Sequence, residues 1–486
     1  MLNLNYELPS RKVLSNSLLS ASYEHCVTKI RTIVDTTRYV AITTDGWTSI
    51  NNEGFYAITA HFIDDDCKMK SGLLPSFKFV GQHTSENISE QIKKTLSEWH
   101  VDNKIVACVT DNAANIVKAV QLAKWWHVPC FAHSLNLIVQ SSLPKITDTV
   151  NKVKSVVEFF KRSSSATEKL QINQKRMGIE VLKLKEDCST RWNSTFDMLR
   201  RFLQNKEPLQ STMGILNIPS LPILSPEDWY IIENCCDILY IFNEMTTELS
   251  AEKNVTLSKI AVLSKNLINY CLRLKNENFE SVSVNNLVNK LHEEVTTRFK
   301  RKYRNIDLIW EAAFLDPRFK QHGFHEDDSF KQTKQNIIDK CFEIKEKYKV
   351  NTPTDESVEI PTSSTSSKQA RFGDMWSEFD SSVETILKKS DNSHAAAIIE
   401  VDKYLHMPII SRKDDPLLWW KENKSLFPSL FELMLKRLCI SATPVPCERI
   451  FSKTGQIITE RRNRLSAEKS TKMIFLNSYF NNYDCN

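Results

Sequence analysis

The chain has 486 residues, a length that suggests two to four domains of ordinary size. Its net charge of +5 is mildly basic, which allows a basic patch but excludes a polycationic nucleic-acid-binding tail. Hydrophobic residues make up 41% and charged residues 25%, so wholesale disorder is excluded. Only nine glycines occur, which disfavours a turn-rich all-β chain, a glycine-rich phosphate loop and a Rossmann fold, and favours long helices.

Neither a membrane helix nor a secretory signal is expected. No apolar run approaches the roughly 20 residues of a spanning helix, and the N-terminal MLNLNYELPSRK lacks an apolar signal core. The twelve cysteines include no Cys-x-x-Cys pair and should stay reduced. Cys130 and His133 form a Cys-x-x-His pair without a second pair nearby, so no structural zinc is predicted.

The first third of the chain predicts a mixed sheet. Residues 1–36 have helical apolar spacing, and three strands then form an antiparallel meander: one within 38–49 that enters a loop at a glycine turn, and two over 54–64 and 69–80. Pro75 favours an edge position for the third strand.

Helices and strands then alternate. A helix over 84–99 begins at Thr84 and leads to a fourth strand over 105–112, which should lie parallel to the first because a helix connects them. A helix over 112–123, a short strand over 127–131 and a helix over 132–143 follow. The order βββαβαβα is that of an RNase-H-like sheet.

The remainder is helical. Apolar residues recur with helical spacing from about 145 to 350, and a Ser/Thr/Pro-rich stretch follows. The predicted organisation is a helical N-terminal part at 1–36, a first core part at 37–200, an all-α domain at 201–400 containing a disordered linker at 351–372, and a C-terminal region at 410–482.

Three acidic residues are candidates for a catalytic metal site. Asp45 follows the first strand and Asp111 ends the fourth, so both carboxylates should project from one sheet edge. Glu448, in the C-terminal region, is the candidate third acid. Such a set suits Mg²⁺ or Mn²⁺, which prefer oxygen ligands and promote phosphodiester cleavage. An aspartate at a strand end can also be simply a turn former.

Six ordered motifs resemble those of the hAT superfamily of cut-and-paste DNA transposases and host proteins derived from them, in particular the BED-finger group. They are TTDGWTS, VTDNAANI, PCFAHSLNL, TRWNSTFDML, DPRFK and SATPVPCERIFSKTGQIITERRNRL. The resemblance implies an α/β RNase-H-like catalytic core interrupted by a large all-α insertion domain, with a helical C-terminal dimerisation region. It places Asp45, Asp111 and Glu448 at the metal-binding positions.

The resemblance also implies DNA contacts. Cys130 and His133 match a motif whose histidine lies near the scissile DNA. Arg191 and Trp192 match a pair in which the tryptophan stacks on an extruded base, an interaction worth roughly 1–3 kcal/mol. Packing within the protein is the alternative for both His133 and Trp192. The basic residues Arg461, Arg462 and Arg464 are close in sequence to Glu448 and could follow a phosphate backbone.

The last 65 or so residues resemble the family's dimerisation region. Its apolar positions at helical spacing supply either a subunit interface, intradomain core, or both. These candidate dimerisation residues are Trp419, Trp420, Phe427, Phe431, Leu435 and Leu438.

The expected function is that of a nuclear, DNA-binding, self-associating transposase or transposase derivative. If active, the family's chemistry is metal-assisted strand cleavage, hairpin formation and strand transfer. A catalytically silent regulatory protein that keeps only the fold and interface is the alternative, and a cellular nuclease is a third. The family's BED finger begins with Cys-x2-Cys, which this sequence lacks; gene truncation, decay and loss in a host derivative are all consistent with this.

Overall fold

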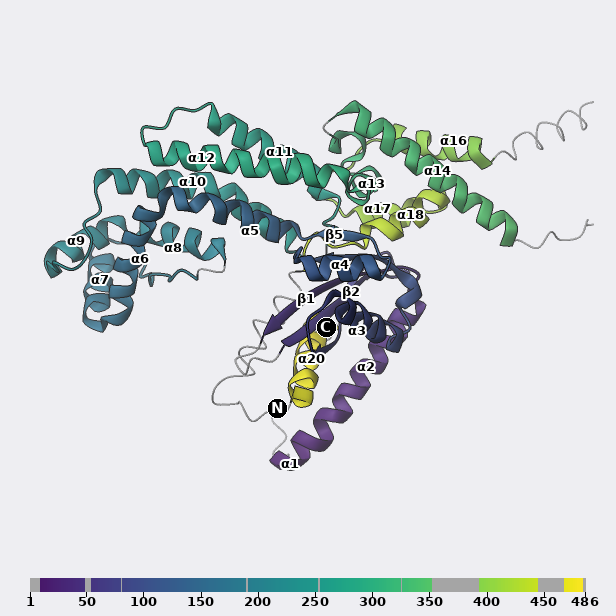
Figure 1. The fold of residues 1–486 in the computed structure, drawn as a ribbon, viewed down its shortest axis with the longest axis horizontal. Coiled ribbons are helices and arrows are strands. Elements are labelled where there is room, and N and C mark those ends of the chain that lie inside the picture. The colour runs from purple at the N-terminus through teal and green to yellow at the C-terminus, as the bar shows by residue number, and fades with distance from the viewer. Residues whose placement is uncertain are drawn as a thin grey trace, which may run out of the picture.

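The computed structural model describes residues 9–48, 54–79, 81–188, 191–251, 254–324, 326–351, 393–444 and 467–483. Within these ranges the chain is helix-rich, with one small mixed sheet (Figure 1). None of the described helices is both long enough and apolar enough to cross a membrane. The linker predicted at 351–372 lies, apart from Asn351, outside the described residues, as do Glu448, Arg461, Arg462 and Arg464.

The five-stranded sheet has the order β3-β2-β1-β4-β5. The first three strands form the predicted antiparallel meander, and β4 pairs with β1 in parallel, as does β5 with β4. Pro75 is in β3, which is an edge strand, as predicted. The strands are β1 (Val40–Thr48), β2 (Gly54–Ile63), β3 (Met69–Lys78), β4 (Ile105–Thr110) and β5 (His127–Pro129).

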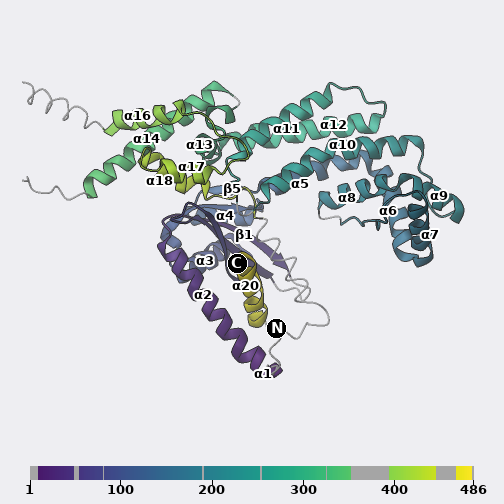
Figure 2. The same ribbon diagram turned by 180° about the vertical axis from the view of Figure 1, so that it is seen from behind.

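Helices from both ends of the described chain cover one face of the sheet. Alternate residues of the strands, such as Ile42 and Ile58, pack there with Ile30 of α2 and Phe475 of α20. The C-terminal helix therefore returns to a sheet built from the first third of the chain (Figures 1 and 2). The helices near this face are α1 (Arg11–Val13), which a π-turn joins to α2 (Leu19–Thr36), with α3 (Ser85–Glu98), α4 (Ala114–Leu122) and α20 (Ala467–Tyr483).

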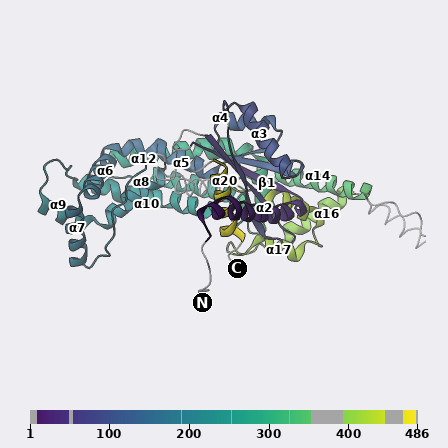
Figure 3. The same cartoon turned by 90° about the horizontal axis from the view of Figure 1, so that it is seen from below.

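The opposite face joins the core of the helical part. Ala41, Val109 and Val128 from the strands share one apolar cluster with Phe131 and Leu135 of α5. Seen from below, the helices extend to both sides of the sheet, with α6 to α12 on one side and α14 and α16 on the other (Figure 3).

The helices of this part have lengths typical of soluble domains. They are α5 (Phe131–Ser142), α6 (Thr147–Arg162), α7 (Ser164–Arg176), α8 (Trp192–Gln204), α9 (Lys206–Leu216), α10 (Pro226–Leu249), α11 (Lys259–Lys275), α12 (Val282–Val295), α13 (Asp307–Leu315), α14 (Asp327–Asn351), α16 (Ser393–His406), α17 (Pro416–Asn423) and α18 (Pro428–Leu438).

Buried thiols make the helical core sensitive to alkaline pH. Burial raises the pKa of Cys271 on α11 to about 12, whereas an unfolded thiol ionises near pH 8.5. The folded state therefore keeps a proton that the unfolded state releases, so this contribution to stability is complete below pH 8.5 and is lost as the pH rises toward 12.

We expect the free energy of unfolding to fall between pH 7.5 and 9.5, and to fall by about 1.4 kcal/mol less in Cys271→Ala. Urea unfolding under reducing conditions at both pH values measures this difference. Cys188→Ala removes an exposed thiol and is the control. An identical pH response in the wild type and Cys271→Ala would contradict the assignment.

Candidate functional site

Asp45 and Asp111 meet at one edge of the sheet. The parallel register pairs Thr43 of β1 with Val109 of β4. Two residues further on stand Asp45, within β1, and Asp111, the first residue after β4, so both lie at the same end of two neighbouring parallel strands. Both are half-buried. The structure thus places the two acids that the sequence singled out at one end of the sheet.

The backbone around each carboxylate is fixed locally. The Gly46 N–H donates to Asp45 Oδ1 at 2.9 Å, and the Ala113 N–H donates to Asp111 Oδ1 at 3.1 Å. Asn112 has a φ of 72°, a left-handed conformation that asparagine tolerates better than most residues. This turn redirects the chain from β4 into α4 and leaves Asp111 at the sheet edge.

The carboxylates act electrostatically on two neighbouring rings. Burial and then the charges of Asp111 and Asp45 raise the pKa of Tyr56 on β2. Burial lowers the pKa of His127, an effect that the charge of Asp111 opposes. The His127 Nε2 lies 2.9 Å from the Thr110 hydroxyl. The edge therefore carries two carboxylates, a neutral phenol and an imidazole whose neutral form is favoured.

The donor set fits a small divalent cation that prefers oxygen ligands. In the described part of the chain, however, no three His, Cys, Asp or Glu side chains are grouped to hold a metal ion. Asp45 and Asp111 would need a further ligand, and the candidate, Glu448, lies outside the described residues.

Cys130 is a buried residue that caps a helix, and it is not part of a surface that could contact DNA. Its side chain is fully buried, and its Sγ accepts the His133 N–H at 3.1 Å as the N-cap of α5. A capped and buried thiol cannot contact DNA in this conformation, which corrects the prediction for Cys130. His133 is half-buried in the first turn of the same helix.

Trp192 is also buried. Its side chain is 1% exposed and packs against Phe196 and Phe242. The backbone N–H of Trp192 donates to Asn136 Oδ1 at 3.1 Å, which ties the start of α8 to α5. In this conformation the indole presents no face for base stacking, whereas the preceding Arg191 is exposed. This difference was not predictable from the sequence, because both residues stand at a helix start.

Most of the candidate dimerisation residues belong to the chain's own core. Trp420, Phe427 and Leu438 are fully buried, and Leu435 is nearly so. Trp419 and Phe431 pack against the same core but are half-buried. The four buried residues therefore belong to the core of the chain rather than to a subunit interface. An interface would have to use other side chains of these helices, such as the exposed Leu418.

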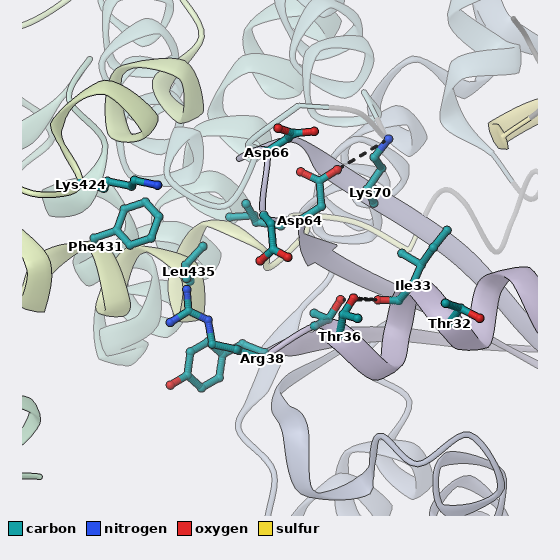
Figure 4. Close-up of a pocket in the computed structure, with 14 residues that line it drawn as sticks. Thr32, Ile33, Thr36, Arg38, Asp64, Asp66, Lys70, Lys424, Phe431 and Leu435 are labelled. Carbon is teal, nitrogen blue, oxygen red and sulfur yellow. Dashed lines mark hydrogen bonds and ion pairs between the residues drawn. The ribbon is translucent and has the colours of Figure 1, made fainter. Parts of the chain in front are cut away.

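Figure 4 shows a cavity of about 590 Å³ beside the turn after β2. It lies near Tyr39, at the end of β1 away from Asp45. The start of β1, the turn after β2 and helix α18 line it, and Phe431 and Leu435 contribute its apolar wall. Asp64 and Lys70 form an ion pair of 3.8 Å across the turn. The residues that line this cavity do not include Asp45 or Asp111.

Basic residues of α18 and of the segment after α12 are partly engaged inside the protein. Arg437 donates to the buried Glu311 at 2.6 Å, and Lys436 lies over the ring of Tyr39. Arg298 pairs with Glu294 at 3.3 Å. These three side chains are less available to phosphates than their sequence suggests.

Comparison with known proteins agrees with this architecture. The family model described as the ZBED1 RNase-like domain matches residues 43–125, the ZBED1 RNase-like helical domain matches 128–238, and the hAT family C-terminal dimerisation region matches 400–480. The chain carries the RNase-like and dimerisation domains of hAT transposases and BED zinc-finger proteins.

Curated relatives of this group align with most of the chain. A putative AC transposase of Zea mays is 26% identical and the match covers 88% of this chain and 55% of the relative. Human zinc finger BED domain-containing protein 4 is 23% identical, with 97% and 40% covered. The RICESLEEPER 3 protein of Oryza sativa subsp. japonica is 23% identical, with 88% and 59% covered. The chain spans about half the length of the curated relatives it matches.

Proposed function

We propose that the chain is a hAT-type, transposase-derived protein that binds DNA, self-associates and acts in the nucleus. Its RNase-like part would be an RNase-H-like core, interrupted by a helical insertion, in which Asp45, Asp111 and Glu448 hold Mg²⁺ or Mn²⁺. The single observation that carries the proposal is the parallel pairing of β1 with β4, which puts Asp45 and Asp111 at the same end of the sheet. A cation held there would stabilise the charge that develops on a phosphodiester during cleavage.

The path of the chain supports the assignment of Glu448. The Phe131 N–H donates to the Ala442 carbonyl at 3.0 Å, and the neighbouring Cys130 N–H donates to the carbonyl of Thr110, next to Asp111, at 2.8 Å. Glu448 comes six residues after Ala442, a stretch that spans at most about 20 Å when fully extended. The acid edge is therefore within reach of Glu448.

DNA would approach the surface where α5 and α8 meet. The hydrogen bond between Asn136 and Trp192 holds exposed Arg191 beside the helix that carries His133. Arg191 and His133 are the candidates for contacts near the cleaved strand, and Arg461, Arg462 and Arg464 are candidates for phosphate contacts. Self-association is supported by the match to the dimerisation region over residues 400–480.

Arg191→Ala should weaken DNA binding because it removes one exposed positive charge from this surface. We expect an affinity loss of about fivefold and a decrease of about one in the slope of log affinity against log salt concentration. Fluorescence anisotropy over a salt series measures both quantities. Arg176→Ala removes an exposed arginine of α7 and should change neither; equal effects of the two substitutions would contradict the proposed surface.

The alternative is a regulatory protein without catalytic activity. Burial of Trp192 favours it, because the base-stacking group of the family is not displayed. The test is cleavage of nicked or hairpin-forming DNA by the full chain with Mn²⁺ and with a chelator. Mn²⁺-dependent strand breaks with new ends would support the transposase activity. DNA binding and self-association without strand breaks would favour the regulatory function.

A further inference from the structure

A tyrosine and a histidine lie next to the two chain segments that carry the acid pair. Tyr56 on β2 lies directly opposite Gly46 of β1, the residue that follows Asp45. A Cβ atom at residue 46 would lie 3.1 Å from Tyr56 Cε1 and 3.5 Å from its hydroxyl oxygen. The phenol therefore lies across the backbone of Gly46, which explains why a glycine occupies that position in a strand.

His83 holds this ring at the loop between β3 and α3. The Tyr56 hydroxyl lies 3.4 Å from His83 Nδ1, and the His83 ring packs on Phe79 with centroids 4.4 Å apart. A Cβ atom at Gly54 would lie 2.7 Å from the His83 ring. Two glycines in a chain that contains only nine thus make room for the two rings.

The loop that carries His83 is also tied to the helix after Asp111. The Asn115 side chain on α4 donates to the His83 carbonyl at 3.3 Å. The start of the same helix holds Asp111, since the Ala113 N–H donates to its Oδ1 at 3.1 Å. His83 is therefore linked to the Asp45 strand through Tyr56 and to the Asp111 turn through Asn115.

We propose that Tyr56 and His83 are a positioning pair for the acid edge, an inference that rests on the proposed function. Tyr56 pairs with Gly46 and therefore lies on the face of the sheet opposite to the Asp45 side chain, so the pair acts through the backbone. The hydrogen bond between the phenol and His83 joins the strand of Asp45 to the loop that Asn115 ties to the Asp111 turn. The pair thereby keeps Asp45 and Asp111 close enough to share a divalent cation, as groups that orient metal ligands do elsewhere. The raised pKa of Tyr56 is consistent with a hydroxyl that stays protonated there.

The test is the affinity of the full chain for Mn²⁺ alone, measured by titration calorimetry without DNA. Tyr56→Phe keeps the ring and removes the hydroxyl, and we expect about tenfold weaker binding. His83→Phe keeps the ring packing on Phe79 but removes the nitrogen, so it should also weaken binding. His83→Asn restores a polar atom near the Nδ1 position and should recover most of the affinity.

Tyr39→Phe is the matched control. Tyr39 immediately precedes β1, at the end of that strand away from the acids, and its hydroxyl donates to the Glu432 carboxylate. Its loss should leave Mn²⁺ affinity unchanged. If His83→Phe binds Mn²⁺ normally and His83→Asn does not, the ring serves packing alone and the proposal is overturned.

Asp45→Asn separates this inference from the proposed function. If Asp45→Asn leaves Mn²⁺ affinity unchanged, the metal site itself is wrong and both proposals fail. If Asp45→Asn weakens binding while Tyr56→Phe does not, the acid site stands and only the positioning pair is overturned. Circular dichroism of each variant verifies that the fold is retained.

Discussion

Asp111→Asn is expected to reduce Mn²⁺-dependent DNA strand cleavage by at least about a thousandfold. The substitution keeps the size of the side chain and removes the charge that would hold a divalent cation beside Asp45. Stabilisation of charge in a phosphoryl-transfer reaction commonly supplies several kcal/mol, and about 4 kcal/mol corresponds to this loss in rate. Because Asn can still accept the Ala113 N–H at the end of β4, the fold should persist.

The measurement is the single-turnover rate of cleavage on nicked or hairpin-forming DNA. Asp148→Asn removes an exposed acid from the first turn of α6 and is the matched control. DNA binding should be retained in both variants, because the substitution takes away a metal ligand rather than a cationic contact. Equal cleavage by the wild type and Asp111→Asn would show that any observed nuclease activity arises elsewhere.

Trp420→Ala should destabilise the fold by about 4 kcal/mol, as large-to-small substitutions of buried aromatic residues do. The Trp420 side chain is fully buried, and its ring is stacked on Tyr404 with centroids 5.3 Å apart. Its Nε1–H donates to the Leu315 carbonyl at 2.9 Å. Alanine would leave both a cavity and an unsatisfied carbonyl at the end of α13.

Urea unfolding followed by tryptophan fluorescence and circular dichroism measures this loss. Leu418→Ala on the same helix removes a side chain that is 55% exposed and should change stability by less than about 0.5 kcal/mol. The effect of Trp420→Ala should be the same at low and high protein concentration. A variant of normal stability that dissociates on dilution would instead place Trp420 at a subunit interface.

The strands were predictable because their signal is local. Alternation over 54–64 and the apolar run at 105–112 each lie within one element, and the helix between them determined that β4 pairs with β1 in parallel. Asp45 and Asp111 followed from the same reasoning. Periodicity, in contrast, shows that a helix has an apolar face but not what covers that face. Trp192 could therefore be assigned to DNA or to the core, and Trp420 to a subunit interface or to the core.

The contribution of Tyr56 and His83 could not be read in the same way. Their proximity depends on the register between β1 and β2 and on the path of the loop after β3, both of which are tertiary. One signal was nonetheless present. Gly46 and Gly54 are rare glycines in strand positions, where glycine often marks the close approach of another group, and both come shortly before Tyr56 in the sequence.

The return of α20 to the sheet has a consequence for how the protein is made. The face that Ile42 and Ile58 present is completed by Phe475, which is synthesised more than four hundred residues after the first strand. During synthesis this part of the apolar face stays exposed until α20 has left the ribosome. An exposed apolar face can aggregate or bind chaperones. Nonsense mutations anywhere before residue 467 should therefore yield aggregation-prone products rather than partly competent ones.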